Sequence, residues 1–369
     1  MAGSNIVASG DASPPADTGA NMRYRPLGQG TGLRVSELAL GSGLFGTRWG
    51  YGAQPDEVRR MLHTYRDLGG NFIDTADFYQ FGEAETQIGD FLEGQRDQFI
   101  VASKYTLGGA SSPAVATTGN NRKNLIQSVE ASLRRLRTDH IDLLWVHMSD
   151  GLTDVEEIMR GLDDTVRAGK VVYVGFSDFP AWRISRAATI AELRGWTRVS
   201  AIQTQYSLVE RASDREILPM ARAFDMGITA WSPLGGGLLT GKYRRGESGR
   251  ATTFGRVIHH ESTAQKKLVM DVVLEVAGET GQSASQIALA WLLAQGIVPI
   301  IGPRTTEQLM DNIEACSVRL SGEQICKLDE ASALQPEFPA DFLADPFQSD
   351  RLAGGDPAKL YETTSKPVR

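Results

Sequence analysis

The segment Phe99-Ile-Val-Ala-Ser-Lys104 is an apolar run that ends in a lysine. An ammonium group at the end of a buried strand is costly unless a nearby group pairs with it. Two other apolar runs carry candidate partners. The run Asn71-Phe-Ile-Asp-Thr-Ala-Asp-Phe-Tyr79 contains an aspartate and a tyrosine, and Ile141-Asp-Leu-Leu-Trp-Val-His147 ends in a histidine. Three strand-like segments therefore finish on groups that can hold a charge or transfer a proton.

Short apolar runs alternate with helical patterns along most of the chain. Strands are expected at residues 37–41, 72–74, 99–104, 141–147, 171–174, 201–203, 228–231 and 297–301. Helices are expected at residues 55–67, 83–92, 121–136, 154–168, 181–193, 214–224, 266–279, 284–293 and 306–314. Eight strand–helix units with short apolar strands favour a closed (β/α)8 TIM barrel over an open sheet.

The chain divides into three parts. Residues 1–21 are rich in Ala, Gly, Ser, Asp and Pro, without the basic and apolar regions of a signal peptide, and are expected to be a disordered leader. Residues 22–335 are expected to form a single barrel catalytic domain that opens with a short hairpin. Residues 336–369 are expected to be a partly ordered tail, docked on the barrel through its apolar residues Phe338, Phe342, Leu343 and Phe347.

Composition narrows the class of protein. The 369 residues include 38 basic and 45 acidic ones, for a net charge of -7, which argues against binding to nucleic acid or to an anionic membrane surface. No apolar run is long enough to span a membrane. The two cysteines, Cys316 and Cys326, lack metal-binding spacing, so we expect no metal, no disulfide framework and a cytoplasmic setting. The oligomeric state stays open.

Two glycine-rich motifs suggest nucleotide binding. Gly41-Ser-Gly43-Leu-Phe-Gly46 matches the dinucleotide fingerprint, but eight residues separate its third glycine from the helix expected at residue 55, which argues against a Rossmann fold. Gly236-Gly-Leu-Leu-Thr-Gly-Lys242 resembles a P-loop, but Tyr243 stands where Ser or Thr must reach magnesium. A triphosphatase is disfavoured, whereas Lys242 remains a candidate phosphate contact.

The strand-end groups suggest proton transfer. Tyr79 taken alone would be a loop aromatic that packs its ring, but Lys104 needs a carboxylate, and Asp74 lies on the neighbouring strand. A free phenol has a pKa near ~10, and a nearby ammonium lowers that pKa. Asp74 would keep Lys104 charged, so that Tyr79 serves as a general acid. His147 ends a strand on the same face and is expected to orient a substrate oxygen.

These residues resemble the aldo-keto reductase family from about residue 24 to residue 315. The family pattern of Asp, Tyr, Lys and His matches Asp74, Tyr79, Lys104 and His147. Similar motifs are Gly175-Phe-Ser-Asp178, Gln203-Thr-Gln-Tyr206, Trp231-Ser-Pro-Leu-Gly235 and Gly302-Pro-Arg-Thr-Thr-Glu-Gln308-Leu-Met-Asp-Asn312. The last two look most like the bacterial and potassium-channel-β-like branches.

The resemblance implies an extended NADP(H) across the barrel mouth. Trp231 would stack on the nicotinamide, while Ser177 and Gln203 hold its carboxamide. The remaining cofactor candidates are Ser232, Leu234 and Lys242 at the pyrophosphate, Arg304 and Gln308 at the 2′-phosphate, Asn312 at the adenine, and Gly41, Ser42, Asp178 and Gly302. A guanidinium at that phosphate favours NADP over NAD.

Three residues depart from the family pattern. Asp178 stands where many members carry Asn, which is expected to alter the carboxamide contact. Gln80 replaces a common Gly after the tyrosine, and Ser149 replaces a common Pro after the histidine; both should adjust the rim of the pocket.

The resulting hypothesis is an NADP(H)-dependent oxidoreductase that interconverts a small aldehyde or ketone and the corresponding alcohol. The alternative is an NADPH-binding regulatory or sensor subunit with negligible turnover. His147 argues against the sensor, because a sensor has no need of a group that orients substrate. The sequence does not identify the substrate or the preferred direction.

Overall fold

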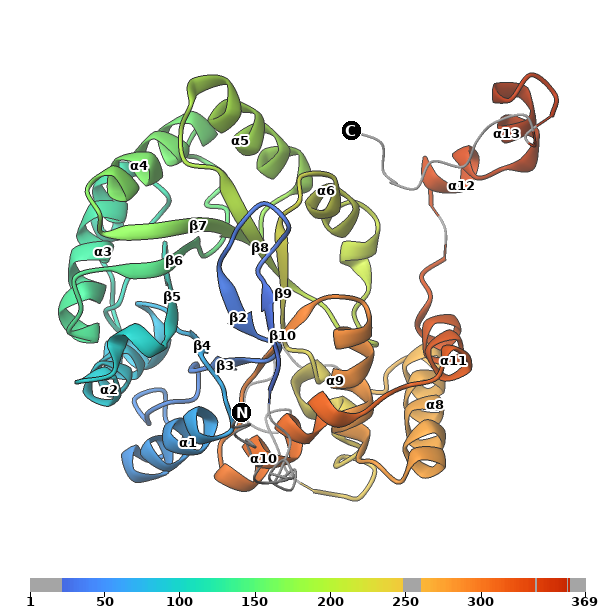
Figure 1. Cartoon of the computed structure of the whole chain (residues 1–369), viewed down its shortest axis with the longest axis horizontal. Helices are drawn as coiled ribbons and strands as arrows, with labels where there is room; N and C mark the ends of the chain where they lie inside the picture. Colours follow the sequence, from blue (N-terminus) through green and yellow to red (C-terminus); the bar gives the residue numbers. More distant parts are fainter. Residues whose placement is uncertain (1–21, 248–259, 336, 357, 359–369) are drawn as a thin grey trace, which may run out of the picture.

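A computed structural model describes residues 22–247, 260–335, 337–356 and 358, so the predicted leader lies outside the described residues. Eight parallel strands close into a barrel in the order β10-β3-β4-β5-β6-β7-β8-β9, which confirms the predicted TIM barrel (Figure 1). The barrel strands are β3 (Ala39–Gly41), β4 (Phe72–Asp74), β5 (Ile100–Tyr105), β6 (Ile141–Val146), β7 (Val171–Ser177), β8 (Val199–Gln205), β9 (Gly227–Trp231) and β10 (Val298–Ile301).

Helices surround the barrel on its outer side (Figure 1). They are α1 (Pro55–Asp67), α2 (Glu83–Leu92), α3 (Arg122–Leu136), α4 (Val155–Arg167), α5 (Ala181–Arg194), α6 (Ile217–Ala223), α8 (Ala264–Thr280), α9 (Ala284–Ala294) and α10 (Thr306–Glu314). Several begin where a side chain accepts a hydrogen bond from the first turn, as Asn121, Asp154 and Ser283 do. These caps explain why the predicted helix starts fall close to the observed ones.

The N-terminal hairpin closes the bottom of the barrel. Its strands β1 (Tyr24–Pro26) and β2 (Arg34–Ser36) pair antiparallel, as predicted. The buried side chains of Leu27 and Val35 join an apolar cluster that includes Phe72, Leu143 and Trp145 from the barrel strands. Because this end is plugged by apolar side chains, the polar strand ends gather at the opposite, C-terminal end.

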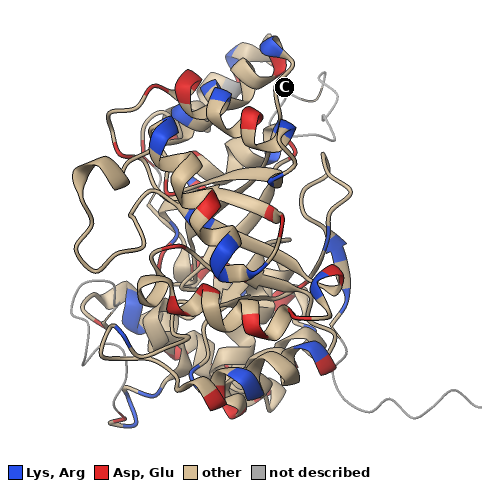
Figure 2. Cartoon of the chain, turned by 90° about the vertical axis from the view of Figure 1, so that its left-hand side faces the viewer, with Lys and Arg blue, Asp and Glu red and all other residues tan. Residues whose placement is uncertain are grey.

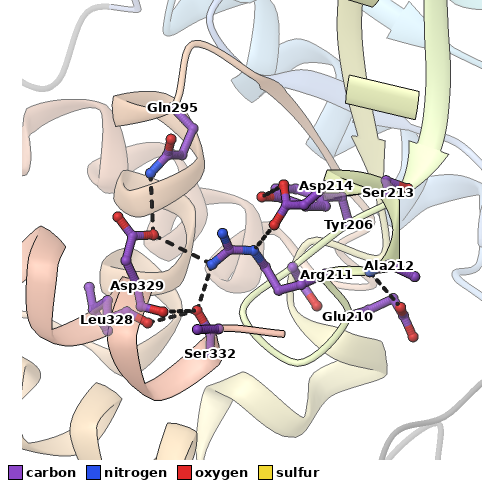
Figure 3. A network of polar contacts seen from close by, with 12 residues as sticks. Tyr206, Glu210, Arg211, Ala212, Ser213, Asp214, Gln295, Leu328, Asp329 and Ser332 are labelled. Carbon is purple, nitrogen blue, oxygen red and sulfur yellow. Dashed lines mark hydrogen bonds and ion pairs between the residues drawn. The ribbon is translucent and has the colours of Figure 1, made fainter. Parts of the chain in front are cut away.

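One further helix, α11 (Gly322–Ser332), was not predicted, and it is tied to the loop after β8 by a polar network (Figure 3). Arg211 in that loop bonds Asp214 at 2.5 Å and, on α11, Asp329 at 3.4 Å and Ser332 at 2.7 Å. The Arg211 guanidinium carbon also lies 4.9 Å from the centroid of the Trp291 ring on α9. The network therefore joins three segments that are far apart in the sequence.

The C-terminal tail does not dock on the barrel as predicted. Helices α12 (Ala340–Leu343) and α13 (Pro346–Leu352) extend away from the barrel in Figure 1. The side chains expected to dock are exposed by 79%, 53%, 60% and 65% for Phe338, Phe342, Leu343 and Phe347. Helices of four and seven residues present no continuous apolar stripe, which is why four aromatic and aliphatic residues do not suffice for docking.

Charged residues of both signs are interspersed over the outer helices (Figure 2). Some of them link neighbouring helices: Arg194 of α5 bonds Glu156 of α4 at 3.1 Å, and Arg137 after α3 bonds Asp90 of α2 at 2.8 Å. Within the described ranges, no helix combines the length and the apolar character that crossing a membrane requires.

Candidate active site

The four predicted catalytic residues meet at the C-terminal end of the barrel. Asp74 is the last residue of β4, Tyr79 follows in a short 3-10 helix, Lys104 lies near the end of β5, and His147 directly follows β6. The Lys104 Nζ donates to Asp74 Oδ2, to the Thr75 carbonyl at 2.9 Å and to Tyr79 Oη at 3.1 Å. The ring centroids of Tyr79 and His147 are 5.9 Å apart.

Asp74 is held by three donors from three strands. Besides Lys104, its Oδ1 accepts from Trp145 Nε1 at 3.1 Å and from Gln203 Nε2 at 3.0 Å. The residue is 1% exposed. A buried ion pair is favourable only when its remaining hydrogen-bonding capacity is satisfied, and these contacts satisfy it. Asp74 is therefore fixed as the counter-ion that keeps the ammonium in place.

The environment sets the protonation of Lys104 and Tyr79. Burial acts to lower the pKa of Lys104, but Asp74 and Tyr79 outweigh it and raise that pKa above its ordinary value. Burial raises the pKa of Tyr79, and Lys104 only partly opposes it. The predicted lowering of the pKa of Tyr79 is thus wrong in its net direction, because removal of the phenolate from water and the charge of Asp74 outweigh Lys104. Tyr79 is held as a protonated phenol, ready to donate.

His147 is a neutral imidazole in this structure. It is 9% exposed, and burial, followed by the charge of Lys104, lowers the pKa of His147 to about 3. Its Nδ1 is buried and has no hydrogen-bond partner among the described residues. A neutral ring with an unused polar atom suits a hydrogen bond to a substrate oxygen and does not suit proton donation.

Two adjoining cavities contain nearly all predicted cofactor residues. A cavity of about 280 Å³ is lined by Asp74, Tyr79 and His147 and by the candidates Gly41, Ser177, Asp178, Gln203, Trp231, Ser232 and Gly302. A cavity of about 670 Å³ shares Ser232 and Gly302 with it and is lined further by Leu234, Lys242, Arg304, Gln308 and Asn312. Ser42 lines neither cavity; it is buried, and its N–H donates to the Asp74 carbonyl at 2.9 Å.

The residues present fit a dinucleotide. Ser177 Oγ is buried beside the smaller cavity and has no hydrogen-bond partner among the described residues. Buried polar atoms are normally hydrogen-bonded, so this hydroxyl fits a polar ligand such as an amide. Lys242 and Arg304 place two cations along the larger cavity, which suits phosphates. Gln203 was expected to hold the nicotinamide carboxamide, but its amide nitrogen donates to Asp74 Oδ1. Only its amide oxygen remains to accept a hydrogen bond from the carboxamide.

Trp231 and Arg304 are each held by a neighbour. Trp231 Nε1 donates to Asp178 Oδ1 at 3.0 Å, which fixes one edge of the indole. The Arg304 guanidinium carbon lies 4.6 Å from the centroid of the Tyr51 ring, and its backbone N–H donates to Gln308 Oε1 at 2.9 Å. Gln308 therefore acts on the loop of Arg304 as well as facing the cavity.

Some residues of the site were not predicted. Tyr51, Arg245, Gln282, Ser283 and Ser285 line the larger cavity. Ser283 forms a capping box with Gln286 at the start of α9, a pattern visible in the sequence. Tyr51, Arg245 and Gln282 lie outside the α-helices and strands, where loop conformation leaves no such signal, and Ser285 lies in the first turn of α9.

Gln80 does more than adjust the pocket rim. It is fully buried with a positive φ of 51°, and its Nε2 donates to the carbonyls of Gly43 at 3.2 Å and Tyr51 at 3.1 Å. Its Oε1 accepts from the Trp49 N–H at 2.8 Å. Gln80 thereby ties the loop of residues 43–51 to the segment that carries Tyr79. Ser149, the other rim residue, accepts a hydrogen bond from Arg183.

A third cavity, of about 690 Å³, lies at the opposite end of the barrel beside the N-terminal hairpin. It is lined by the arginines Arg23, Arg25, Arg222 and Arg319, and it contains no counterpart of the Asp–Lys–Tyr–His set. Among the described residues, no group of three or more His, Cys, Asp or Glu side chains is arranged to hold a metal ion. The site with proton-transfer groups is therefore the one at the C-terminal end.

A family model described as "Aldo/keto reductase family" matches residues 37–333. The chain belongs to this family. Norsolorinic acid reductase of Aspergillus flavus is 38% identical over 340 residues, which cover 89% of this chain and 86% of the relative. A putative aryl-alcohol dehydrogenase, AAD14, of Saccharomyces cerevisiae is 35% identical over 380 residues and covers 96% of both chains. Aryl-alcohol dehydrogenase [NADP(+)] of Phanerodontia chrysosporium is 35% identical over 348 residues, 88% of this aldo-keto reductase and 89% of the relative.

These relatives support an oxidoreductase that acts on small molecules. All three are fungal, so they do not show the predicted likeness to the bacterial and potassium-channel-β-like branches. That branch assignment stays a prediction.

Proposed function

We propose that this aldo-keto reductase is an NADP(H)-dependent oxidoreductase that interconverts an aromatic aldehyde or ketone and the corresponding alcohol. The observation that carries the proposal is the 3.1 Å contact between Lys104 Nζ and Tyr79 Oη, in a cavity that also contains His147. A protonated phenol beside a fixed ammonium is a proton donor that remains stabilised after it has given up its proton.

The residues divide the reaction between them. NADPH, when bound, supplies the hydride that reduces the carbonyl carbon. Tyr79 donates its proton to the carbonyl oxygen, and Lys104 stabilises the phenolate that this leaves behind. Asp74 holds Lys104 in place, and the neutral ring of His147 donates a hydrogen bond that orients the carbonyl oxygen. In the reverse direction the same phenolate accepts the alcohol proton.

An aromatic substrate is supported by the rings beside Tyr79. The Trp49 ring lies 5.1 Å from the Phe78 ring and 6.1 Å from the Tyr79 ring, between centroids, with an edge-to-face arrangement in the second pair. Aromatic groups prefer such tilted neighbours. The names of two relatives specify aryl alcohols. Trp49 Nε1 is buried and has no hydrogen-bond partner among the described residues.

The preference for NADP over NAD rests on Arg304. Its guanidinium lines the larger cavity, packs on Tyr51 and forms no ion pair within the described residues. A planar guanidinium binds a phosphate through two hydrogen bonds, and NAD lacks the 2′-phosphate that would accept them. The relative from Phanerodontia chrysosporium is named for NADP(+).

The test is a substrate screen that follows NADPH absorbance in both directions, with aromatic and aliphatic aldehydes, ketones and alcohols. We expect turnover with aromatic compounds and a loss of at least ~100-fold in Tyr79→Phe, as for removal of a general acid, with NADPH affinity unchanged. A Tyr79→Phe enzyme of near-normal rate would overturn the assignment.

The same screen also tests the alternative, an NADPH-binding regulatory or sensor subunit. Tight NADPH binding without turnover of any compound would favour the sensor. The neutral, unpartnered Nδ1 of His147 favours the enzyme, because a sensor does not require it. A cytoplasmic location and the absence of nucleic-acid or membrane partners belong to the same proposal.

A further inference from the structure

The proposed reaction assigns roles to Tyr79, Lys104, Asp74 and His147 but none to the carboxylate of Asp178. Asp178 directly follows β7, and its backbone adopts a left-handed conformation with φ of 50°. It lines the cavity of about 280 Å³ together with Tyr79, His147 and Trp231, and the residue is exposed toward that space. Its carboxyl group therefore faces whatever occupies the cavity.

The charges around this cavity do not cancel. Lys104 is engaged by Asp74, while Tyr79 and His147 are both neutral, as derived above. Asp178 forms no ion pair among the described residues, and its Oδ1 accepts a hydrogen bond from Trp231 Nε1 at 3.0 Å. When Asp178 is ionised, the cavity thus carries one negative charge that no cation of its own neutralises.

Geometry places the hydride donor in the same cavity. Tyr79 protonates the carbonyl oxygen, so the carbonyl carbon must lie next to Tyr79 and the donor ring must contact that carbon. A cavity of about 280 Å³ leaves little separation between that ring and Asp178. The oxidised nicotinamide ring carries a positive charge, whereas the reduced ring is neutral. Opposite charges at contact distance attract, and an uncharged ring gains nothing from a carboxylate.

We propose that Asp178 makes the site select the oxidised, cationic cofactor over the reduced one, and so favours alcohol oxidation on the enzyme. This inference rests on the proposed function. The equilibrium of the overall reaction in solution is unchanged, because Asp178 alters only the relative affinities of the two cofactor forms. The hydrogen bond to Trp231 adds a positioning role, since it fixes the indole ring that would border the nicotinamide.

The preference depends on pH in a defined direction. Burial raises the pKa of Asp178 to about 6, against the opposing effects of the Trp231 hydrogen bond, the Lys104 charge and the Ser177 hydroxyl. Lys104, the nearest cation, stays charged across neutral pH, because Asp74 and Tyr79 outweigh burial and raise the pKa of Lys104. Above that pKa the carboxylate is ionised and NADP+ binds more tightly; below it the carboxyl group is neutral and the preference fades.

The decisive variant is Asp178→Asn. Asparagine tolerates the left-handed backbone and still accepts a hydrogen bond from Trp231, so that only the charge is removed. Dissociation constants for NADP+ and NADPH are measured by calorimetric titration between about pH 5 and pH 8, on either side of the carboxyl titration. We expect the ratio of the NADPH to the NADP+ constant to rise with pH in the wild type, and to fall about tenfold at pH 8 in Asp178→Asn.

Two matched variants control for other causes. Asp97→Asn removes an exposed carboxylate that has no ion pair or hydrogen bond among the described residues, in the 3-10 helix Arg96–Gln98 before β5, and should leave the ratio unchanged. Ser177→Ala removes a neutral contact in the same cavity and, at pH 8, where Asp178 is ionised in both proteins, should weaken both cofactor forms alike.

The outcomes separate the two proposals. A ratio that stays within about twofold of the wild type in Asp178→Asn at every pH overturns the selection by charge. If the wild type binds neither cofactor form, the proposed function itself fails, whatever Asp178 does. If both cofactor forms bind and the ratio of their dissociation constants does not change with pH, the proposed oxidoreductase function is retained and the proposed role of Asp178 is rejected.

Discussion

Lys104 shows how one buried charge organises a site. Its ammonium makes three contacts, to Asp74, the Thr75 carbonyl and Tyr79, and all three partners come from the segment that begins at the end of β4. The ammonium does not bring the pKa of Tyr79 below its ordinary value, because burial outweighs it. Its effect is to limit that rise, and to stabilise the phenolate once the proton has left.

Replacing Lys104 by methionine should therefore cut turnover sharply while cofactor binding survives. The pKa of Tyr79 would rise further, since the one contribution that lowers it through charge is gone. We expect a fall in kcat of about 100-fold or more, measured by NADPH absorbance, with the NADPH dissociation constant little changed. Failure to bind NADPH in a folded Lys104→Met protein would instead make Lys104 a cofactor ligand.

The variant also leaves Asp74 as a buried, unpaired carboxylate, which costs stability. The double variant Asp74→Asn/Lys104→Met removes both charges and controls for this. It should recover thermal stability without recovering turnover.

Asp77 gives a prediction about stability and pH. It is 1% exposed, and burial, followed by repulsion from Glu85, raises the pKa of Asp77 to about 7. Because this pKa lies above the ordinary value near 3.9 of an unfolded aspartate, the folded protein binds the proton more tightly. The resulting stabilisation is complete below about pH 4 and is lost as the pH rises to about 7.

Asp77→Asn should consequently melt at a higher temperature than the wild type at pH 8, and at a similar temperature near pH 4, in thermal unfolding followed by circular dichroism. The exposed Asp97→Asn serves as the control and should show neither effect. A constant difference between Asp77→Asn and the wild type across this range would contradict the assignment.

At the scale of elements, the loop of residues 43–51 is held over the site by one side chain. Gln80 makes three hydrogen bonds to the backbone of that loop, which carries Trp49 to the edge of Tyr79. Gln80→Ala removes all three and should loosen the loop. We expect KM for an aromatic substrate to rise several-fold, while kcat and the NADPH dissociation constant change less than twofold, as for loss of a contact made equally in ground and transition states.

Gln87→Ala is the matched control for this loop. Gln87 lies on α2 and donates to Glu83 of the same helix at 3.4 Å, so its loss keeps all three Gln80 contacts with the loop and should leave KM unchanged. If Gln80→Ala alters kcat and KM by the same factor as Gln87→Ala, the loop is not held by Gln80.

At the scale of the whole molecule, Arg211 joins α11 to the barrel (Figure 3). It connects the loop after β8 with α11 through Asp329 and Ser332. Arg211→Met keeps much of the packing on Trp291 but leaves Asp214 and Asp329 without their cation. We expect a loss of about 2 kcal/mol in the free energy of unfolding, measured by urea denaturation.

The control is Arg215→Met. Arg215 is exposed and pairs with Glu337 at 2.7 Å at the surface, where such pairs contribute at most about 1 kcal/mol. Equal losses in the two variants would show that the Arg211 network is no more than a surface ion pair.

The sequence alone was sufficient for the barrel and for the four strand-end residues. Strand periodicity identifies where each apolar run ends, and in a parallel barrel those ends meet at one face, so Asp74, Lys104 and His147 could be placed together without coordinates. The cofactor candidates came from family motifs, and the structure places nearly all of them in two adjoining cavities. Their roles stay predictions.

Only the tertiary structure shows that burial keeps Tyr79 protonated and that Gln203 donates a hydrogen bond to Asp74. Only the tertiary structure shows, too, that Gln80 is buried and that the apolar side chains of the tail are exposed. Each of these depends on how far groups are removed from water and on which group from a distant segment lies closest. A sequence pattern records which residues share a face. It does not record the distances between faces, and it is these distances that set a pKa, direct an amide hydrogen bond or leave an apolar helix uncovered.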